Sequence, residues 1–436
     1  MAEKEGWVYI LTNSSMPDLV KIGYSMKDPI DRAEELSSGT AVPTPYIVNY
    51  KALVPNPSYV ENEVHRKLQS KRTNQKREFF KCEPSEAIKL IRELGNVKYE
   101  QTLSGKEAIS QLKVDKRCIE CDLTKADLRR IDLQDADLTG ANLEGANLED
   151  TTLVNTKFKG ANLKSANLRM AKLLGVDLSD TNLEGASLEN ANLKDVELSR
   201  VNLESANLSK ANLDGVVIRD ANLRNINLQD AYSPITDLVK SDLSNANCKN
   251  AKLFGADLQK ANLAGANLSW VDLSTANLEE ANLKEADLSH AHLKNSTLQG
   301  ANLKNTNLKN ANFKGINLSR VDLGGGNFER ANLDAAKLEY ANLAGANLEG
   351  ANLEDAYLEG ANLEGANLKG ANLEYASLKR ANLEGANLEG VKFSGTVMPD
   401  GSRTPESGDS QRRKREEMFK LFEARLAEKK KKNQNQ

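Results

Sequence analysis

The sequence predicts a small α/β domain, followed by an all-β solenoid and a basic C-terminal helix. Three observations carry this prediction: helix starts and β-branched runs in the first hundred residues, an apolar residue at every fifth position from Leu123 to Phe393, and a cluster of cations after residue 411. The predicted boundaries are 1–95 for the α/β domain, 96–117 for a linker and solenoid cap, 118–398 for the solenoid, 399–411 for a linker, and 412–436 for a basic amphipathic helix and tail.

The α/β domain is predicted to run β-β-α-β-α-β-α. A hairpin is indicated by two β-branched runs, "WVYILTN" and "LVKIGYS", which "SSMPD" connects. A helix follows in "DPIDRAEELSS", where Asp28 can cap the N-terminus and Pro29 fits the first helical position. The remaining elements are a strand in "PYIVNYKALV", a helix in "NPSYVENEVHRKLQSK", a short extended "REFFKC" and a helix in "SEAIKLIREL".

The five-residue period indicates a closed coil. It occurs 55 times without an insertion, and the residue two places before the apolar one is nearly always small. An α-helix turns by about 140° net over five residues and would spread the leucines over all its faces. A flat strand alternates its faces, so a step of five would turn every second leucine outward. Both inward residues stay buried only if the chain turns a corner in every repeat and stacks on its neighbours.

One repeat departs from this pattern, because "AYSPI" has Ser233 at the apolar position and Pro234 after it. Proline cannot donate a ladder hydrogen bond. The repeat is therefore predicted to form a bulge or short surface loop, with a contact knob for a protein partner as the alternative. Trp270 and Phe254 fall at outward positions and are candidates for the same kind of contact surface.

The two ends of the solenoid need covers, because each coil is otherwise packed only against its neighbours. The stretch "GKEAISQLKVD" predicts a short helix over the first coil. In the tail, Met418, Phe422 and Leu426 recur at helical spacing among cations. This helix is expected to cap the last coil, to pair with a partner, or to bind nucleic acid through its charge.

Composition sets the expected compartment. The net charge of −3 divides into about +1 for the first hundred residues, −9 for residues 101–400 and +5 for the rest. Four cysteines are too few for a disulfide scaffold, and we expect Cys118 and Cys121 in the core of the first coil, because zinc would need two further ligands. No apolar run reaches the ~18 residues of a membrane span, and no signal-peptide pattern is present. We expect a cytoplasmic protein without membrane contact.

The repeat A-(N/D)-L-x-x, from Cys118 to Met398, resembles the pentapeptide-repeat family. The resemblance implies a right-handed quadrilateral β-solenoid with four repeats in each coil. Stacked Asn and Asp side chains would then form ladders between coils. Some members of this family resemble duplex DNA and bind type II topoisomerases, which gives one candidate function.

Between Trp7 and Leu94, the chain resembles the GIY-YIG nuclease superfamily, in particular the phage-type branch often described as DNA-binding. The motifs that carry the resemblance occur in the same order: "VYIL", "LVKIG", "DPIDRAEELSS", "VPTPYIV", "ENEVHRKL" and "REFF". The resemblance implies DNA as a partner, Mg²⁺ or Mn²⁺ as a cofactor, and phosphodiester hydrolysis. Trp7 replaces the glycine of the first motif and Lys21 the tyrosine of the second, which are departures from the superfamily pattern.

The resemblance also implies site residues. Catalytic roles fall on Tyr9, Lys21, Arg32 and His65, metal binding on Glu61, and DNA contacts on Gly23, Arg72, Lys76 and Arg77. A single carboxylate can hold Mg²⁺, which keeps most of its waters, and an arginine fork matches a phosphate. Glu78, in "REFF", is the second choice as metal ligand.

The remaining roles concern the proton and the approach of the phosphate. Tyrosine is a poor base at its ordinary pKa of about 10, so Lys21 is expected to lower the pKa of Tyr9 or to handle a proton itself. Gly23 is expected to let the phosphate approach without a Cβ in the way.

These inferences favour a metal-dependent DNA endonuclease whose solenoid is a spacer or an interaction surface for a protein partner. The alternatives are a DNA-binding module without cleavage and a DNA mimic that binds a type II topoisomerase. A nuclease requires the predicted catalytic and metal residues to meet in one cleft. A mimic requires a continuous acidic face along the solenoid.

Overall fold

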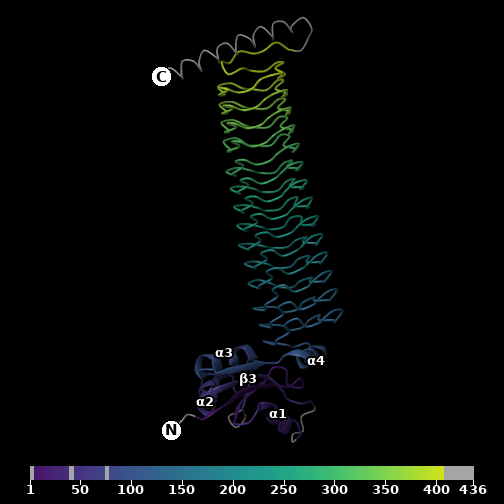
Figure 1. The fold of residues 1–436 in the computed structure, drawn as a ribbon, viewed down its shortest axis with the longest axis vertical. Coiled ribbons are helices and arrows are strands. Elements are labelled where there is room, and N and C mark those ends of the chain that lie inside the picture. Colours follow the sequence, from purple (N-terminus) through teal and green to yellow (C-terminus); the bar gives the residue numbers. More distant parts are fainter. Residues whose placement is uncertain (1–3, 39–43, 74–77, 407–436) are drawn as a thin grey trace. The chain divides into compact units, whose positions relative to one another are not determined.

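The computed structural model describes residues 4–38, 44–73 and 78–406. The chain divides into two compact units, Met1–Asn167 and Leu168–Gln436, which are described in turn. The first unit holds the α/β domain and the first coils of the solenoid, and the second unit holds the remaining coils (Figure 1).

In the described part of the first unit, antiparallel strands form one sheet in the order β4-β2-β1-β3-β5. The strands are β1 (Glu5–Thr12), β2 (Val20–Ser25), β3 (Ile47–Pro55), β4 (Phe79–Phe80) and β5 (Tyr99–Thr102). The predicted hairpin is the β1–β2 pair. β5 was not predicted, because its side chains are mostly exposed and "YEQT" therefore has no apolar alternation to reveal a strand.

The described helices of this unit are α1 (Pro29–Ser38), α2 (Pro57–Lys67), the 3₁₀ turn η1 (Gln69–Lys71), α3 (Pro84–Gly95) and α4 (Gly105–Asp115). The first three α-helices begin with proline, whose missing N–H and fixed φ suit that position. The predicted cap of α1 is confirmed, since the Asp28 carboxylate accepts the Ile30 N–H at 3.0 Å. Before α2, Asn56 instead adopts a left-handed conformation with φ of 55° and makes no side-chain cap bond.

Strand alternation divides the core of the α/β domain into two layers. Val8 and Ile10 of β1 face the layer that α2 and α3 complete, with Val64 and Ile91 among its buried residues. The opposite face carries Tyr9 and Leu11 and packs against Ala33 of α1. The sheet therefore lies between α1 on one face and α2 with α3 on the other.

The short helix α4 covers the first coil, as predicted. Ala108 and Leu112 on α4 are buried, and Ser104 forms a parallel bridge with Asp122 in the solenoid. Cys118 and Cys121 are buried in the first coil, which agrees with the expected core role. They are also joined by a disulfide, which the sparse cysteine content did not predict.

The second unit is built from stacked four-sided coils. Parallel bridges join residues twenty positions apart, as in Asn302↔Asp322 and Asn342↔Asn362, so one coil takes four repeats (Figure 1). In nearly all repeats the apolar residue and the small residue point inward and are buried; Ala386 and Val391, near the end of the solenoid, are only partly buried. The last residue of each repeat forms the corner and has a positive φ, which Gly345 adopts at 64° without the steric cost of a Cβ. The predicted corner in every repeat is thus present.

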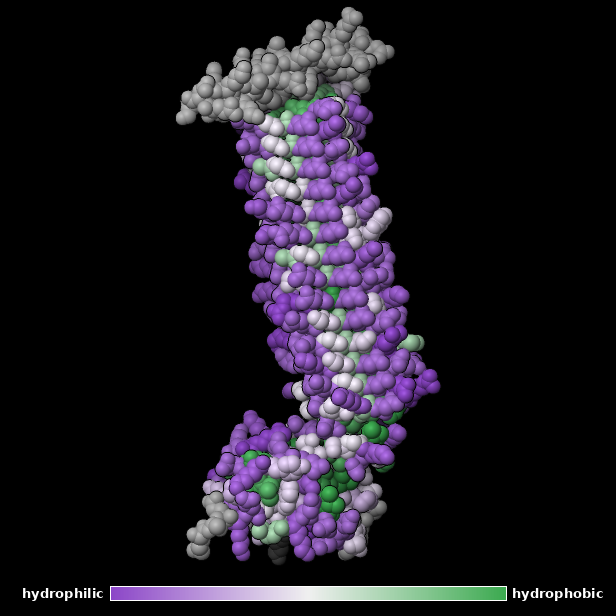
Figure 2. All heavy atoms as spheres, in the orientation of Figure 1, coloured by the Kyte–Doolittle hydropathy of each residue, from purple (hydrophilic) through white to green (hydrophobic). Residues whose placement is uncertain are grey.

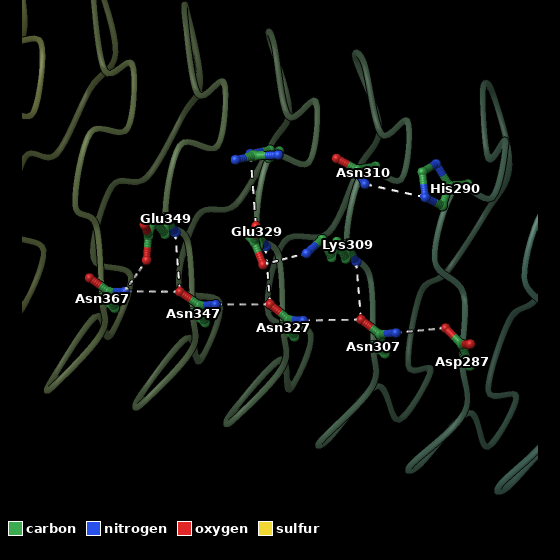
Figure 3. Close-up of polar contacts among 11 residues, drawn as sticks. Asp287, His290, Asn307, Lys309, Asn310, Asn327, Glu329, Asn347, Glu349 and Asn367 are labelled. Carbon is green, nitrogen blue, oxygen red and sulfur yellow. Dashed lines mark hydrogen bonds and ion pairs between the residues drawn. The ribbon is translucent and has the colours of Figure 1, made fainter.

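Asparagine ladders connect the coils at the partly exposed second position of many repeats (Figure 3). The Asn347 amide donates to the Asn327 side-chain oxygen at 3.0 Å, and the Asn327 amide donates to Asn307 at 3.1 Å. The same Asn327 oxygen accepts the backbone N–H of Glu329 at 3.2 Å. Asparagine is suited to this position because it donates to one coil, accepts from the next and closes its own turn. Aspartate can only accept, as Asp287 does from Asn307 at 2.8 Å.

The predicted bulge at "AYSPI" is wrong, because the coil continues through this repeat. The N–H groups of Ser233 and Ile235 donate to the next coil at 2.9 and 3.0 Å. Pro234 lies between them, at the fourth position of the repeat. In most other repeats the N–H at this position donates only to a side chain of its own repeat. The proline therefore removes no bond between coils. Ser233 is buried and shares a hydrogen bond of 2.6 Å with Thr236, which satisfies both hydroxyls.

The described chain turns back at the end of the solenoid. Arg403 pairs antiparallel with Val397, and the Thr404 N–H donates to the Thr396 carbonyl at 2.9 Å. Residues up to 405 thus pack onto the last coil, although the sequence suggested a linker from residue 399. The predicted basic helix at 412–436 lies outside the described residues. On the face shown in Figure 2, the coils present mainly hydrophilic side chains.

Candidate functional site

The β1–β2 hairpin brings Tyr9 directly opposite Gly23. A Cβ on residue 23 would stand 2.6 Å from the Tyr9 hydroxyl oxygen and 2.7 Å from its ring carbon. Gly23 is therefore required for the phenol to lie across β2. We expected this glycine to leave room for a phosphate, but in the structure that room is filled by the Tyr9 side chain.

Arg32 reaches Tyr9 from α1. Its guanidinium acts on the Tyr9 hydroxyl and donates to Glu35 at 2.8 Å, and about half of its side chain is exposed. Burial raises the pKa of the Tyr9 phenol above its ordinary value, and the interaction with Arg32 only partly offsets this rise. The expectation that Lys21 lowers the pKa of Tyr9 is thus wrong. Tyr9 is a neutral hydrogen-bond donor at neutral pH.

Lys21 is occupied by a partner on the neighbouring strand. β4 pairs with β2 so that Lys21 lies opposite Phe79, and the ammonium forms an ion pair with the Glu78 carboxylate just before β4. Lys21 is 9% exposed. Glu78, the second choice as metal ligand, is therefore paired with a lysine, and the ion pair holds the Lys21 side chain in place.

Glu61 enters the site from α2. Its side chain is nearly buried, at 7% exposure for the residue. Burial raises the pKa of the Glu61 carboxyl to about 7, the charge of Glu78 adds to the rise, and Lys21 and Arg72 oppose it. At neutral pH this carboxyl is close to half-protonated, which is suited to a group that accepts and releases a proton.

His65 lies one turn after Glu61 on α2, with 4.0 Å between its Nε2 and a Glu61 oxygen. The imidazole ring packs on Phe80, and Nε2 lies 3.1 Å from the carbonyl oxygen of Ile22. Burial lowers the pKa of His65, so the ring is neutral at neutral pH and can donate its Nε2 proton to that carbonyl. This bond fixes His65 against the edge of β2.

The predicted DNA-contacting cations are only partly described. Arg72 pairs with Phe80 as an isolated bridge, and its guanidinium stands 5.7 Å from the Phe80 ring centroid. Its charge acts on both Glu61 and His65, so it belongs to the same electrostatic cluster. Lys76 and Arg77 lie outside the described residues.

The donor set fits one kind of metal ion. Among the described residues, no group of three or more His, Cys, Asp or Glu side chains could hold a metal. Glu61 is a nearly buried carboxylate whose charge is disfavoured by its surroundings, with Glu78 as a second carboxylate nearby. Mg²⁺ and Mn²⁺ bind through one or two carboxylates and retain several waters, so the site fits a hydrated divalent ion better than a fully protein-coordinated one.

Lys51 has no role in the sequence-based interpretation, and Asp28 has a role there only as a helix cap. Lys51 of β3 stands opposite Tyr9 of β1, is 6% exposed, and forms an ion pair with Asp28 at 2.7 Å. A lysine in the middle of the apolar strand "IVNYKALV" was the available signal, because a central-strand cation is buried only when paired.

The described chain is therefore a two-part protein, in which an α/β domain with a cluster of ionisable side chains precedes a β-solenoid of five-residue repeats. Residues 6–95 match the T5orf172 domain. Pentapeptide repeats match in 8 copies over residues 117–160, 241–279, 276–315, 316–355, 327–365 and 356–395, and a pentapeptide repeat region matches 155–228. These repeat matches cover more than half of the chain, which belongs to the pentapeptide-repeat family.

Solved pentapeptide-repeat proteins are similar to parts of the chain. HetL from Nostoc sp. strain PCC 7120, described as involved in heterocyst differentiation regulation, is 29% identical over 69% of this chain and 99% of its own, with a TM-score of 0.26. Rfr23 from Cyanothece 51142 is 33% identical over 32% of this chain and 88% of its own, with a TM-score of 0.14. QnrB1, a plasmid-mediated fluoroquinolone resistance protein, is 17% identical over 48% and 88%, with a TM-score of 0.22.

Because these TM-scores are low, the family assignment rests on the repeat matches in the sequence. No curated protein matches the chain. Within the part of the chain that the structure describes, no helix is long and apolar enough to cross a membrane.

Proposed function

We propose that the α/β domain binds DNA and hydrolyses its phosphodiester bonds with the help of a divalent metal ion. The observation that carries this proposal is that Tyr9 of β1 is under the electrostatic influence of both Arg32 of α1 and Glu61 of α2. The match to the T5orf172 domain over residues 6–95 and the resemblance to the GIY-YIG superfamily support the same chemistry.

We assign each side chain a role in the reaction from its charge and its exposure. Arg32 is half-exposed and keeps donors available for a phosphate, whose geometry its planar fork matches. Tyr9, whose raised pKa keeps it neutral, can donate to an oxygen on which negative charge develops. Glu61 would hold the metal ion, which when bound supplies a Lewis acid and a water of lowered pKa.

The chain also offers a second candidate, DNA binding without cleavage. It is favoured by the ion pair between Lys21 and Glu78, which occupies two groups that a nuclease could use, and by the pKa of about 7 that weakens Glu61 as a metal ligand near neutral pH. The cations of the site, Arg32 and Arg72, would still bind phosphates in such a module.

For the solenoid we propose a role as a spacer or as an interaction surface for a protein partner. A DNA-mimic role for the coils is less favoured, because cations pair with carboxylates of neighbouring coils, as Lys194 does with Asp214 and Lys309 with Glu329. These ion pairs interrupt a continuous acidic face.

The two candidate functions are separated by incubating supercoiled plasmid with the full-length protein in Mg²⁺, in Mn²⁺ or in EDTA, and by measuring DNA binding in parallel. The nuclease predicts nicked or linear DNA in the presence of metal only. Arg32→Ala is expected to weaken binding as well as cleavage. Binding without cleavage under all three conditions would select the binding module, and the absence of both would reject the proposed function.

A further inference from the structure

Lys51 has a contact set that the proposed reaction does not use. Its ammonium lies between the two carboxylate oxygens of Asp28, at 2.9 and 2.7 Å, and the ring of Trp7, whose centroid is 5.2 Å away. Lys51 stands directly across the strand pair from Tyr9 and is almost inaccessible to water. A lysine in this position is costly to desolvate, whereas an apolar side chain of similar length would fill the same space without that cost.

Asp28 connects this lysine to α1. One of its oxygens that bonds Lys51 also accepts the backbone N–H of Ile30, so the same carboxylate caps the helix and pairs with the sheet. Arg32 follows one turn later on α1, and its guanidinium interacts with the Tyr9 hydroxyl. The contacts therefore close a ring from Tyr9 through Arg32, α1 and Asp28 to Lys51, which is the strand neighbour of Tyr9.

We propose that Lys51 is a positioning residue, which fixes the start of α1 on the sheet and thereby holds the Arg32 guanidinium against the Tyr9 hydroxyl. This inference rests on the proposed function, since it assigns Lys51 to the phosphate-binding arm of that site. Its physical basis is the rigidity of a helix: a capped first turn held at Asp28 leaves little freedom for a side chain one turn further along.

The test is NMR spectroscopy of the full-length protein with tyrosine labelled with ¹³C at Cζ. The Tyr9 signal is assigned by its loss in Tyr9→Phe. The spectra are recorded at about pH 8.5, where Glu61, with its pKa of about 7, stays ionised. Arg32→Ala then defines the shift of a Tyr9 that has lost its partner.

Lys51→Met keeps the aliphatic stem and removes the ammonium. It is expected to move the Tyr9 signal in the same direction as Arg32→Ala, by at least half as much. In the double variant Lys51→Met/Arg32→Ala, the Tyr9 signal is expected at the same position as in Arg32→Ala alone. Asp28→Asn keeps a capping oxygen and weakens only the ion pair, so it is expected to act like Lys51→Met. The matched control is Asp31→Asn, which removes an exposed carboxylate from the same helical turn and is expected to leave Tyr9 unmoved.

A Tyr9 signal that stays at its wild-type position in Lys51→Met and Asp28→Asn overturns the proposal. If Lys51→Met does not fold, Asp28→Asn decides by the same criterion, and failure of both to fold assigns the pair to stability instead. The readout needs no substrate, so its failure is distinct from a failure of the nuclease proposal. Where the wild type cleaves plasmid, Lys51→Met is expected to lower kcat/KM about tenfold or more; an unchanged kcat/KM with a moved Tyr9 signal would reject the link to catalysis.

Discussion

The Tyr9 hydroxyl lies over the Cα of Gly23, so closely that a Cβ at residue 23 would stand 2.6 Å from the hydroxyl oxygen. Gly23→Ala is therefore expected to force Tyr9 out of its place and to lower the free energy of unfolding by about 1–3 kcal/mol. Denaturation in urea, followed by Trp7 fluorescence in a Trp270→Phe background, measures this loss.

The double variant Gly23→Ala/Tyr9→Leu supplies the control for that prediction. If the close approach of the two residues causes the loss, the two substitutions are coupled and the double variant is more stable than the sum of the single effects. Additive effects would show that Gly23 is needed for another reason.

Glu61 makes the stability of the α/β domain depend on pH. Its pKa is raised to about 7 in the folded state, whereas an unfolded glutamate loses its proton near 4.3. The stabilisation by the neutral carboxyl is therefore fully present below pH ~4.3 and is lost as the pH rises through about 7. Glu61→Gln keeps a neutral side chain, so its stability relative to wild type should grow by about 2–3 kcal/mol between pH 5 and pH 8 in EDTA. A difference that does not change with pH would contradict the buried, proton-binding Glu61.

The asparagine ladder is expected to contribute to the stability of the second unit through its side chains. Asn327→Ala removes the donor to Asn307 and the acceptor for Asn347 and Glu329. A loss of about 1–3 kcal/mol in the unfolding free energy of the coils is expected. The matched control is Lys337→Ala. Lys337 is exposed and occupies the same position of a repeat, on another face of the solenoid. Equal losses of stability for the two variants would argue against the ladder.

The Ser233–Thr236 pair predicts that two substitutions are needed to restore the consensus repeat. Ser233→Leu alone removes the short bond to the Thr236 hydroxyl and leaves only its longer contacts with the carbonyls of Leu213 and Pro234, at 3.2 and 3.4 Å, so it is expected to destabilise the coil. Ser233→Leu/Thr236→Ala recreates the leucine and alanine of neighbouring repeats and is expected to exceed the wild type by about 1–2 kcal/mol. Thermal unfolding of the single and double variants checks this, and a stabilising single variant would contradict it.

Periodicity predicted most of the solenoid, because each five-residue repeat carries its own corner and its own buried pair. The exception was the repeat that contains Pro234. The sequence shows that proline has no N–H to donate, but it does not show that the N–H at this position of a repeat makes no bond between coils. In the α/β domain, caps and apolar alternation predicted the main elements, whereas the exposed strand β5 left no such signal. The family motifs led to Tyr9, Arg32 and Glu61. The pairing of Lys21 with Glu78 and of Lys51 with Asp28 depends on strand register and helix placement, which local sequence does not specify.

The central claim is that Glu61 is the carboxylate on which metal-dependent DNA cleavage depends. The most direct measurement is the single-turnover rate of plasmid nicking in Mg²⁺ from pH 5.5 to 8.5 for wild type, Glu61→Gln and Glu63→Gln. The account predicts that the wild-type rate rises about tenfold per pH unit and levels off near the Glu61 pKa of about 7, or below it where the bound metal lowers that value. Glu61→Gln should lose at least a thousandfold in rate. The control Glu63→Gln should follow the wild-type curve, because it affects only an ion pair with Arg66 on the same helix. Cleavage by Glu61→Gln at the wild-type rate would contradict the claim.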